Sequence, residues 1–294
     1  MVEKKEVKVG EKDKATEKTK AAGRATIAEK PVVKTKKKTT SEEWVAGGAK
    51  KKASSFKKLP KFWQITLRLL AFVAWVAVVL LAAQYLVAML LNLALPTETL
   101  LKPITNMIYG AVVYLLAFLV IVFVPWKLIK MKTTRDELGV RGLPTWTDIL
   151  LAPVGLIVAM LLGGIILMII KCIFPAINLE QEQELGFNNL FGKAELIEGF
   201  IALVVVAPIA EELIFRGWLY GKMRARAPMW PALILCSLLF GFMHGQVNVG
   251  VVTFAMSVVM CLIRELTGTI WSGVLLHMIK NGVAFYLLYV LGVA

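Results

Sequence analysis

Three short motifs place ionisable side chains within apolar stretches of the sequence. The motifs read EELIFR, FGFMH and HMIKN, and their polar residues are Glu211, Glu212, Arg216, His244, His277 and Asn281. The chain contains only two histidines, and both belong to these motifs. A carboxylate at membrane depth costs several kcal/mol unless it is paired or hydrated, so such residues indicate a functional site.

Helical phase separates the two glutamates. Glu212 and Arg216 are four residues apart and share one helix face, with the carboxylate on the favourable N-terminal side. Glu211 is turned about 100° away from them. We therefore expect Glu212 and Arg216 to form an orienting ion pair and Glu211 to be the reactive carboxylate. His277 and Asn281 have the same spacing, so an imidazole and an amide should lie side by side.

These residue types are sufficient for hydrolysis by an activated water. Glu211 and His244 can act together as the general base, while His277 and Asn281 can stabilise the oxyanion. No Ser, Cys or Thr is placed as an obvious covalent nucleophile, and Ser237 is a remote candidate only. A zinc site is the open alternative, with Glu211, His244 and His277 as ligands and water completing the set. The H-E-x-x-H spacing is absent, and the sequence does not decide between the two.

Proline precedes the first motif by one helical turn. In a regular α-helix Pro208 would leave the carbonyl of Val204 without its N–H donor. We expect this to bend the helix beside Glu211.

The composition predicts an all-α, polytopic bundle of about seven to eight transmembrane helices. Hydrophobic residues make up 58% of the chain, the mean hydropathy is +0.70, and apolar runs reach the length that spans a bilayer. The expected spans are 67–95, 104–125, 147–170, 194–223, 231–244, 249–264 and 268–292. With a rise of about 1.5 Å per residue, the three motifs fall at similar depths in their spans.

The formal net charge of +14 is concentrated at the N-terminus. Residues 1–61 carry 19 Lys and Arg against 8 Asp and Glu. We interpret residues 1–60 as a disordered, Lys-rich cytoplasmic tail, and 61–132 as the segment holding the first two spans. The basic loops 126–148 and 216–230 should also face the cytoplasm. No nucleic-acid partner is expected, because the charge lies in this tail rather than on a folded surface.

The order of the motifs resembles a known family. E-E-x-x-x-R, F-x-x-x-H and H-x-x-x-N are similar to those of the CPBP family of intramembrane proteases (CAAX proteases and bacteriocin-processing enzymes, also called the abortive-infection family). The resemblance begins near the stretch RDELGVRGLPTWTD and makes residues 133–294 the protease core. It implies a bundle of membrane helices that hydrolyses a peptide bond of a membrane-associated substrate, either CAAX-like or a leader peptide.

The resemblance also implies roles for individual residues. Glu211 and His244 would activate water, His277 and Asn281 would hold the oxyanion, and Glu212 and Arg216 would support them. The family is often labelled as metalloproteases, although its mechanism resembles a glutamate-activated water, so a divalent metal such as zinc stays open. No other cofactor is implied, and the expected partners are the lipid bilayer and the substrate.

Two other functions fit parts of the sequence. A non-proteolytic membrane scaffold or bacteriocin-immunity protein of the same family would keep the motifs without the activity. A proton-coupled transporter would use Glu and His as a relay, but matched broken helices in the two halves are not visible. All three readings place the chain in the cell membrane as a multi-pass protein with a cytoplasmic N-terminus.

Overall fold

The computed structural model describes residues 59–179 and 192–292, which are helices and loops without a β-strand. The helices are α2 (Lys61–Ala94), α3 (Thr97–Leu100), α4 (Pro103–Ile129), α5 (Arg135–Leu138), α6 (Trp146–Ile173), α7 (Lys193–Phe200), α8 (Ala207–Glu212), α9 (Gly221–Arg224), α10 (Met229–Phe242), α11 (Val247–Thr267) and α12 (Trp271–Phe285), with π-helical segments η1 (Ile201–Val206), η2 (Leu213–Tyr220) and η3 (Tyr286–Val290). All described residues belong to one compact unit. The all-α prediction is confirmed, while the predicted disordered tail lies almost wholly outside the described residues.

Five helices of the described chain are long and apolar enough to cross a membrane. They are α2, α4, α6, α11 and the continuous helix formed by α12 and η3, and α10 is a shorter apolar helix. The remaining predicted span, 194–223, corresponds to the run from α7 to α9. Each predicted span therefore coincides with a helical stretch, and the boundaries differ by a few residues.

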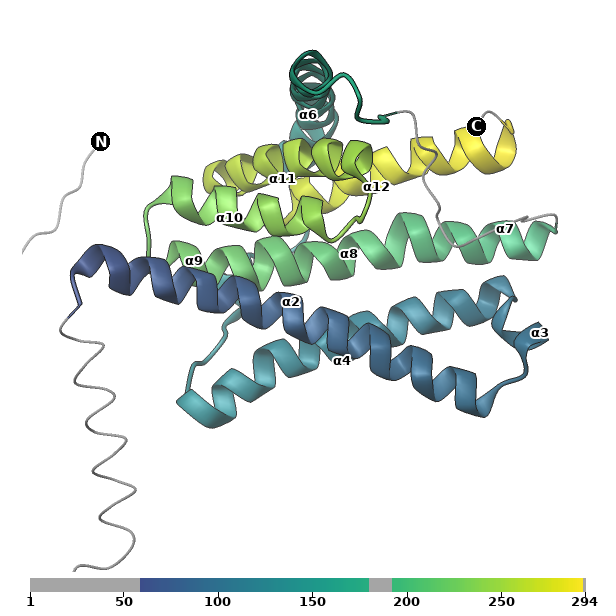
Figure 1. Cartoon of the computed structure of the whole chain (residues 1–294), viewed down its shortest axis with the longest axis horizontal. Coiled ribbons are helices and arrows are strands. Elements are labelled where there is room, and N and C mark those ends of the chain that lie inside the picture. The colour runs from purple at the N-terminus through teal and green to yellow at the C-terminus, as the bar shows by residue number, and fades with distance from the viewer. Residues whose placement is uncertain (1–58, 180–191, 293–294) are drawn as a thin grey trace, which may run out of the picture. The chain divides into compact units, whose positions relative to one another are not determined.

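The run from α7 to α9 is continuous although its hydrogen-bond register changes. The residues at its four internal junctions, Ile201, Ala207, Leu213 and Gly221, all have right-handed helical backbone angles. This central run packs against α4 on one side and against α10 and α12 on the other (Figure 1). The EELIFR motif therefore lies between α4 on one side and α10 and α12 on the other.

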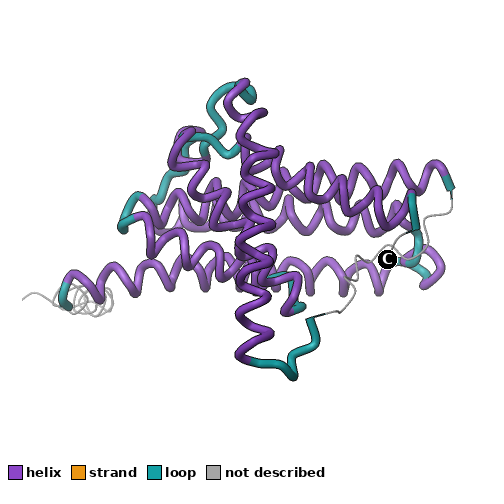
Figure 2. Tube along the Cα trace, turned by 90° about the horizontal axis from the view of Figure 1, so that it is seen from above, coloured by secondary structure: helices purple, strands orange, loops and turns teal. Residues whose placement is uncertain are grey.

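Helix α6 crosses the other long helices at a steep angle and packs on α11 and α12 (Figure 2). Its buried face contains small residues spaced at helical intervals, which permits close approach of membrane helices. These residues include Ala152, Gly155, Ala159 and Gly163. A Cβ atom at Gly155 would lie only 2.6 Å from the Ile263 Cδ1 atom and 2.8 Å from the Leu276 Cδ1 atom, so a larger residue there would require the ends of these side chains to move.

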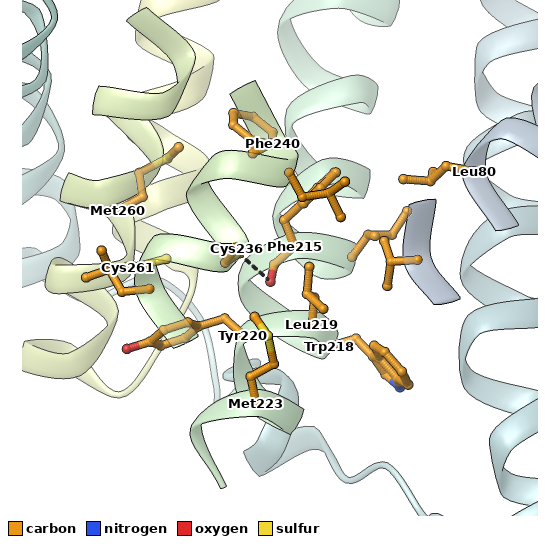
Figure 3. Packing of buried hydrophobic residues seen from close by; sticks show 14 of the residues in the cluster. Leu80, Phe215, Trp218, Leu219, Tyr220, Met223, Cys236, Phe240, Met260 and Cys261 are labelled. Atoms are coloured by element: carbon orange, nitrogen blue, oxygen red, sulfur yellow. Dashed lines mark hydrogen bonds between the residues drawn. The ribbon is translucent and has the colours of Figure 1, made fainter. Parts of the chain in front are cut away.

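Apolar side chains of the central run pack directly against α10. The rings of Phe215 and Phe240 meet edge to face, with their centroids 4.9 Å apart. The Cys236 thiol lies 3.4 Å from the carbonyl oxygen of Phe215 and donates to it (Figure 3). Because α10 leads directly into His244, this packing fixes the second motif relative to the first.

Candidate active site

The structure brings the three motifs to the wall of one cavity of about 220 Å³. It lies between α4, the central run and α12, and the turn after α10 closes it. Its polar lining residues are Tyr114, Glu211, His244, His277, Lys280 and Asn281. The four side chains that the sequence nominates as catalytic thus share one polar chamber inside an apolar bundle.

Glu212 and Arg216 form a buried ion pair beside this cavity. The Glu212 Oε1 atom lies 2.7 Å from the Arg216 Nη1 atom, and the side chains are 0% and 1% exposed. The guanidinium also stacks over the Phe240 ring, 4.1 Å from its centroid, which adds a favourable cation–π contact. The central run is thereby attached to α10 by charge as well as by packing.

His277 lies between the two glutamates of the first motif. Its Nδ1 atom is 3.3 Å from the Glu212 Oε1 atom, and its Nε2 atom is 3.9 Å from the Glu211 Oε2 atom. The ring is buried, as is Glu212. Glu212 therefore orients an imidazole and a guanidinium at once, while Glu211 stays on the cavity wall.

His244 occupies the turn that follows α10. Its Nδ1 atom donates to the carbonyl oxygen of Phe240 at 2.8 Å, which leaves Nε2 as the proton acceptor of the neutral ring. Gly245 has a φ of +74° and reverses the chain there, a backbone conformation that favours glycine. A Cβ atom at Gly241 would lie 2.6 Å from the carbonyl oxygen of Gly250, so α10 and α11 meet at a glycine contact.

Asn281 makes a contact that the α-helical register does not predict. The Ala207 N–H bonds to the carbonyl of Ala202, five residues earlier, which is the π-helical pattern. In this register Pro208, which has no N–H, cannot donate to the carbonyl of Leu203. The expectation that Val204 loses its donor assumed a regular α-helix and stays a prediction. The Asn281 Nδ2 atom donates to the Leu203 carbonyl at 2.8 Å, and Asn281 also lines the cavity.

Tyr114 is a site residue that the sequence did not reveal. Its hydroxyl donates a short hydrogen bond to the Glu211 Oε1 atom across 97 positions of sequence. The contact arises because α4 packs on α8. A tyrosine in an apolar span is ordinarily an anchor or a packing residue, so nothing in the local pattern distinguishes this one. Lys280, the lysine of the HMIKN motif, also lines the cavity.

The start of α12 is held by Asp148. This carboxylate caps α6, with Thr145 at the N-cap in a capping box. Its Oδ1 atom accepts hydrogen bonds from the hydroxyls of Thr269, at 2.9 Å, and Ser272, at 2.7 Å. The helix that carries His277 is therefore tied to α6 at its first turn.

A second group of charged residues lies at the α9 end of the central run, and we call it the α5 cluster. It comprises Glu137, Lys222, Arg224, Arg264 and Glu265. The Lys222 Nζ atom is 2.7 Å from the Glu137 Oε2 atom, and Glu265 accepts from Arg224 at 3.0 Å and from the Tyr220 hydroxyl at 2.8 Å. Arg264 donates to the backbone carbonyls of Arg216 and Glu137.

The ionisation of Glu137 follows from this pairing. Burial opposes the charged form, but hydrogen bonds from Lys222 and from the Thr134 N–H outweigh it, so the pKa of Glu137 falls below its usual value of 4.5. Glu137 is therefore negatively charged at neutral pH, and its ion pair with Lys222 joins α5 to the central run.

The proposed metal ligands do not form a metal site in this arrangement. Within residues 59–179 and 192–292, no three His, Cys, Asp or Glu side chains are grouped so that they can hold one ion. Glu211 is instead engaged by the Tyr114 hydroxyl. Glu211, His244 and His277 are thus not grouped as metal ligands in this arrangement, the zinc alternative stays a prediction, and no step of the chemistry is assigned to a metal. Ser237 is fully buried and does not line the cavity.

One comparison with known proteins gave a match. Residues 193–283 match the family described as Type II CAAX prenyl endopeptidase Rce1-like. The matched range begins at the start of α7, ends within α12 and contains all three motifs. No curated protein and no solved structure matches the chain. Residues 193–283 are therefore similar to the Rce1-like family, in a chain whose described part holds five helices long and apolar enough to cross a membrane.

Proposed function

We propose that this protein is an intramembrane endopeptidase that hydrolyses a peptide bond of a membrane-associated substrate. The observation that carries the proposal is the cavity in which Glu211, His244, His277 and Asn281 meet. The Rce1-like match supports the same class of reaction. A polar chamber with an uncompensated carboxylate is costly inside an apolar bundle, and catalysis gives a reason for it.

The proposed reaction begins with a water molecule beside Glu211. The Glu211 carboxylate removes a proton from the water, with the Nε2 atom of His244 accepting a hydrogen bond from it. The water oxygen then forms a bond to the carbonyl carbon of the substrate, and the carbonyl oxygen becomes an oxyanion. His277 and the free amide hydrogen of Asn281 stabilise this charge.

Collapse of the tetrahedral intermediate completes the reaction. The carbon–nitrogen bond breaks, and the proton held by Glu211 passes to the leaving amine. The products are a carboxylic acid and an amine, so the water is fully accounted for. Glu212 and Arg216 take no part in proton transfer in this scheme, and they hold His277 and the central run in place.

The orientation in the membrane is part of the proposal. We propose that the basic segments 126–148 and 222–226 face the cytoplasm, which puts the α5 cluster at that surface. The N-terminal tail then lies in the cytoplasm as well. A substrate that reaches the cavity from this side is either a prenylated C-terminal cysteine peptide or a leader peptide.

Purified full-length protein in liposomes tests the proposal. We would supply one fluorogenic peptide with a farnesylated CAAX end and one with a leader sequence, and compare the wild type with Glu211→Gln. The wild type should cleave at least one peptide, and Glu211→Gln should lose roughly 10³-fold or more of kcat. Equal cleavage by both proteins would remove the enzymatic proposal and favour a membrane scaffold.

A further inference from the structure

We infer that Tyr114 is a positioning residue for the reaction, and this inference rests on the proposed function. Its hydroxyl holds one oxygen of the Glu211 carboxylate, and the other oxygen is thereby assigned as the one that takes the proton from water. The residue lies on α4, outside the range that matches the Rce1-like family.

The two oxygens of Glu211 have different surroundings. Oε1 accepts the hydrogen bond from Tyr114. Oε2 has no hydrogen-bond partner within the described chain, and it lies 3.9 Å from the His277 Nε2 atom. A carboxylate oxygen that is already engaged is a poorer proton acceptor, so Oε2 is the oxygen available for a water between Glu211 and the imidazoles.

Tyr114 is well placed to hold this orientation because its two ends lie in different environments. The residue lines the polar cavity and also an apolar pocket of about 280 Å³ between α4 and the central run. Phe118, Ile209 and Leu213 are among the other residues that line the apolar pocket. The ring is thus anchored on the apolar side while the hydroxyl reaches Glu211, which is the arrangement that suits an amphipathic ring.

The alternative is a structural role, in which the hydroxyl merely satisfies a half-buried carboxylate. The two roles predict different measurements. A structural hydroxyl would affect stability and every kinetic constant that depends on the folded fraction. A positioning hydroxyl would lower kcat and leave KM and the unfolding temperature nearly unchanged, because it acts on the carboxylate that performs the chemistry.

Tyr109 provides a matched control on the same helix. Its hydroxyl also donates across the bundle, to the backbone carbonyl of Gln84 at 3.3 Å, but it does not line the catalytic cavity. Tyr114→Phe and Tyr109→Phe therefore make the same chemical change, each removing one interhelical hydrogen bond from α4. They differ in whether the lost partner is Glu211.

The experiment measures kcat, KM and thermal unfolding of both variants and the wild type in liposomes, with the peptide that the wild type cleaves. Tyr114→Phe should lower kcat roughly 10- to 100-fold, the range expected for loss of a hydrogen bond to a charged group. Tyr109→Phe should leave kcat within about twofold of the wild type. KM and the unfolding temperature of the two variants should agree.

Two results would overturn the inference. One is a Tyr114→Phe enzyme with the kcat of the wild type, and the other is an equal loss of kcat in both variants. A wild type that cleaves no peptide, or a Glu211→Gln variant as active as the wild type, would instead defeat the proposed function and with it the inference. The inference about Tyr114 and the proposed function are thus contradicted by different results.

Discussion

Charged side chains gather in two regions of this protein, and the regions differ in how completely these groups are paired. In the α5 cluster each charged group has a partner of opposite charge or a carbonyl oxygen. At the catalytic cavity the pairing is incomplete. Within the described chain, Oε2 of Glu211, Oε2 of Glu212, and Nε and Nη2 of Arg216 have no hydrogen-bond partner.

The difference indicates different purposes for the two regions. Buried polar groups in folded proteins are nearly always satisfied, and those that are not call for a reason. Complete pairing in the α5 cluster serves to join α5, the central run and α11. Under the proposed function, incomplete pairing at the cavity leaves the Glu211 carboxylate available to a water. Mutations in the two regions should therefore have separable effects on activity and stability.

A large loss of activity should come from a change at His244. Its Nδ1 atom bonds only to the carbonyl of Phe240 in its own turn, so replacing it by alanine removes a cavity group without breaking a contact between helices. His244→Ala should lower kcat roughly 10²- to 10⁴-fold, the usual range for a general acid–base residue. Peptide cleavage and circular dichroism would be measured together. A helical, fully active variant would show that His244 is a packing residue.

The two adjacent glutamates sharpen the comparison because the same substitution should act differently on each. Glu212→Gln leaves the Arg216 guanidinium buried without its counter-charge, which should lower the free energy of unfolding by roughly 3 kcal/mol. Glu211→Gln should abolish cleavage with a much smaller loss of stability. Thermal unfolding in detergent measures both. Equal destabilisation by the two changes would contradict the division between orienting and reactive carboxylates.

The smallest effect should come from Glu137 in the α5 cluster. Glu137→Gln should cost about 1 kcal/mol or less, because the Glu137 side chain is 36% exposed. Its kcat should match that of the wild type. Asp136→Asn is a matched control, since the Asp136 pair with Arg141 is largely exposed.

The same pair gives a pH dependence with a defined sign. The pKa of Glu137 is lowered in the folded protein, so its contribution to stability is present above pH 4.5 and is lost as the pH falls further, through the folded-state pKa. The difference in unfolding temperature between the wild type and Glu137→Gln should therefore shrink below pH 4.5. A difference that grows on acidification would contradict the assigned ionisation.

The helices could be predicted because their signals are local. Each apolar run corresponds to a helix, and the four-residue spacing of Glu212 and Arg216 places them on one face, where they pair. The three motifs were likewise readable as candidates for one site. The helical rise gave them similar depths, and the structure places them around one cavity.

The features that escaped prediction depend on contacts between distant segments. Tyr114 meets Glu211 only because α4 packs on α8, and a tyrosine in an apolar span carries no mark of such a role. The π-helical register before Pro208, and the hydrogen bond from Asn281 to the Leu203 carbonyl, could not be read from the local sequence pattern. The sequence also assigned α4 to the first two spans, outside the expected protease core of residues 133–294. In the structure, Tyr114 of α4 lines the cavity.

The most direct test of the central claim compares membrane peptides in cells that express equal amounts of wild-type and Glu211→Gln protein. The account predicts that an uncut peptide accumulates in the Glu211→Gln cells, and that purified wild-type enzyme cuts this peptide at a single bond. Identical peptide profiles in the two cell lines, with both proteins folded in the membrane, would contradict it.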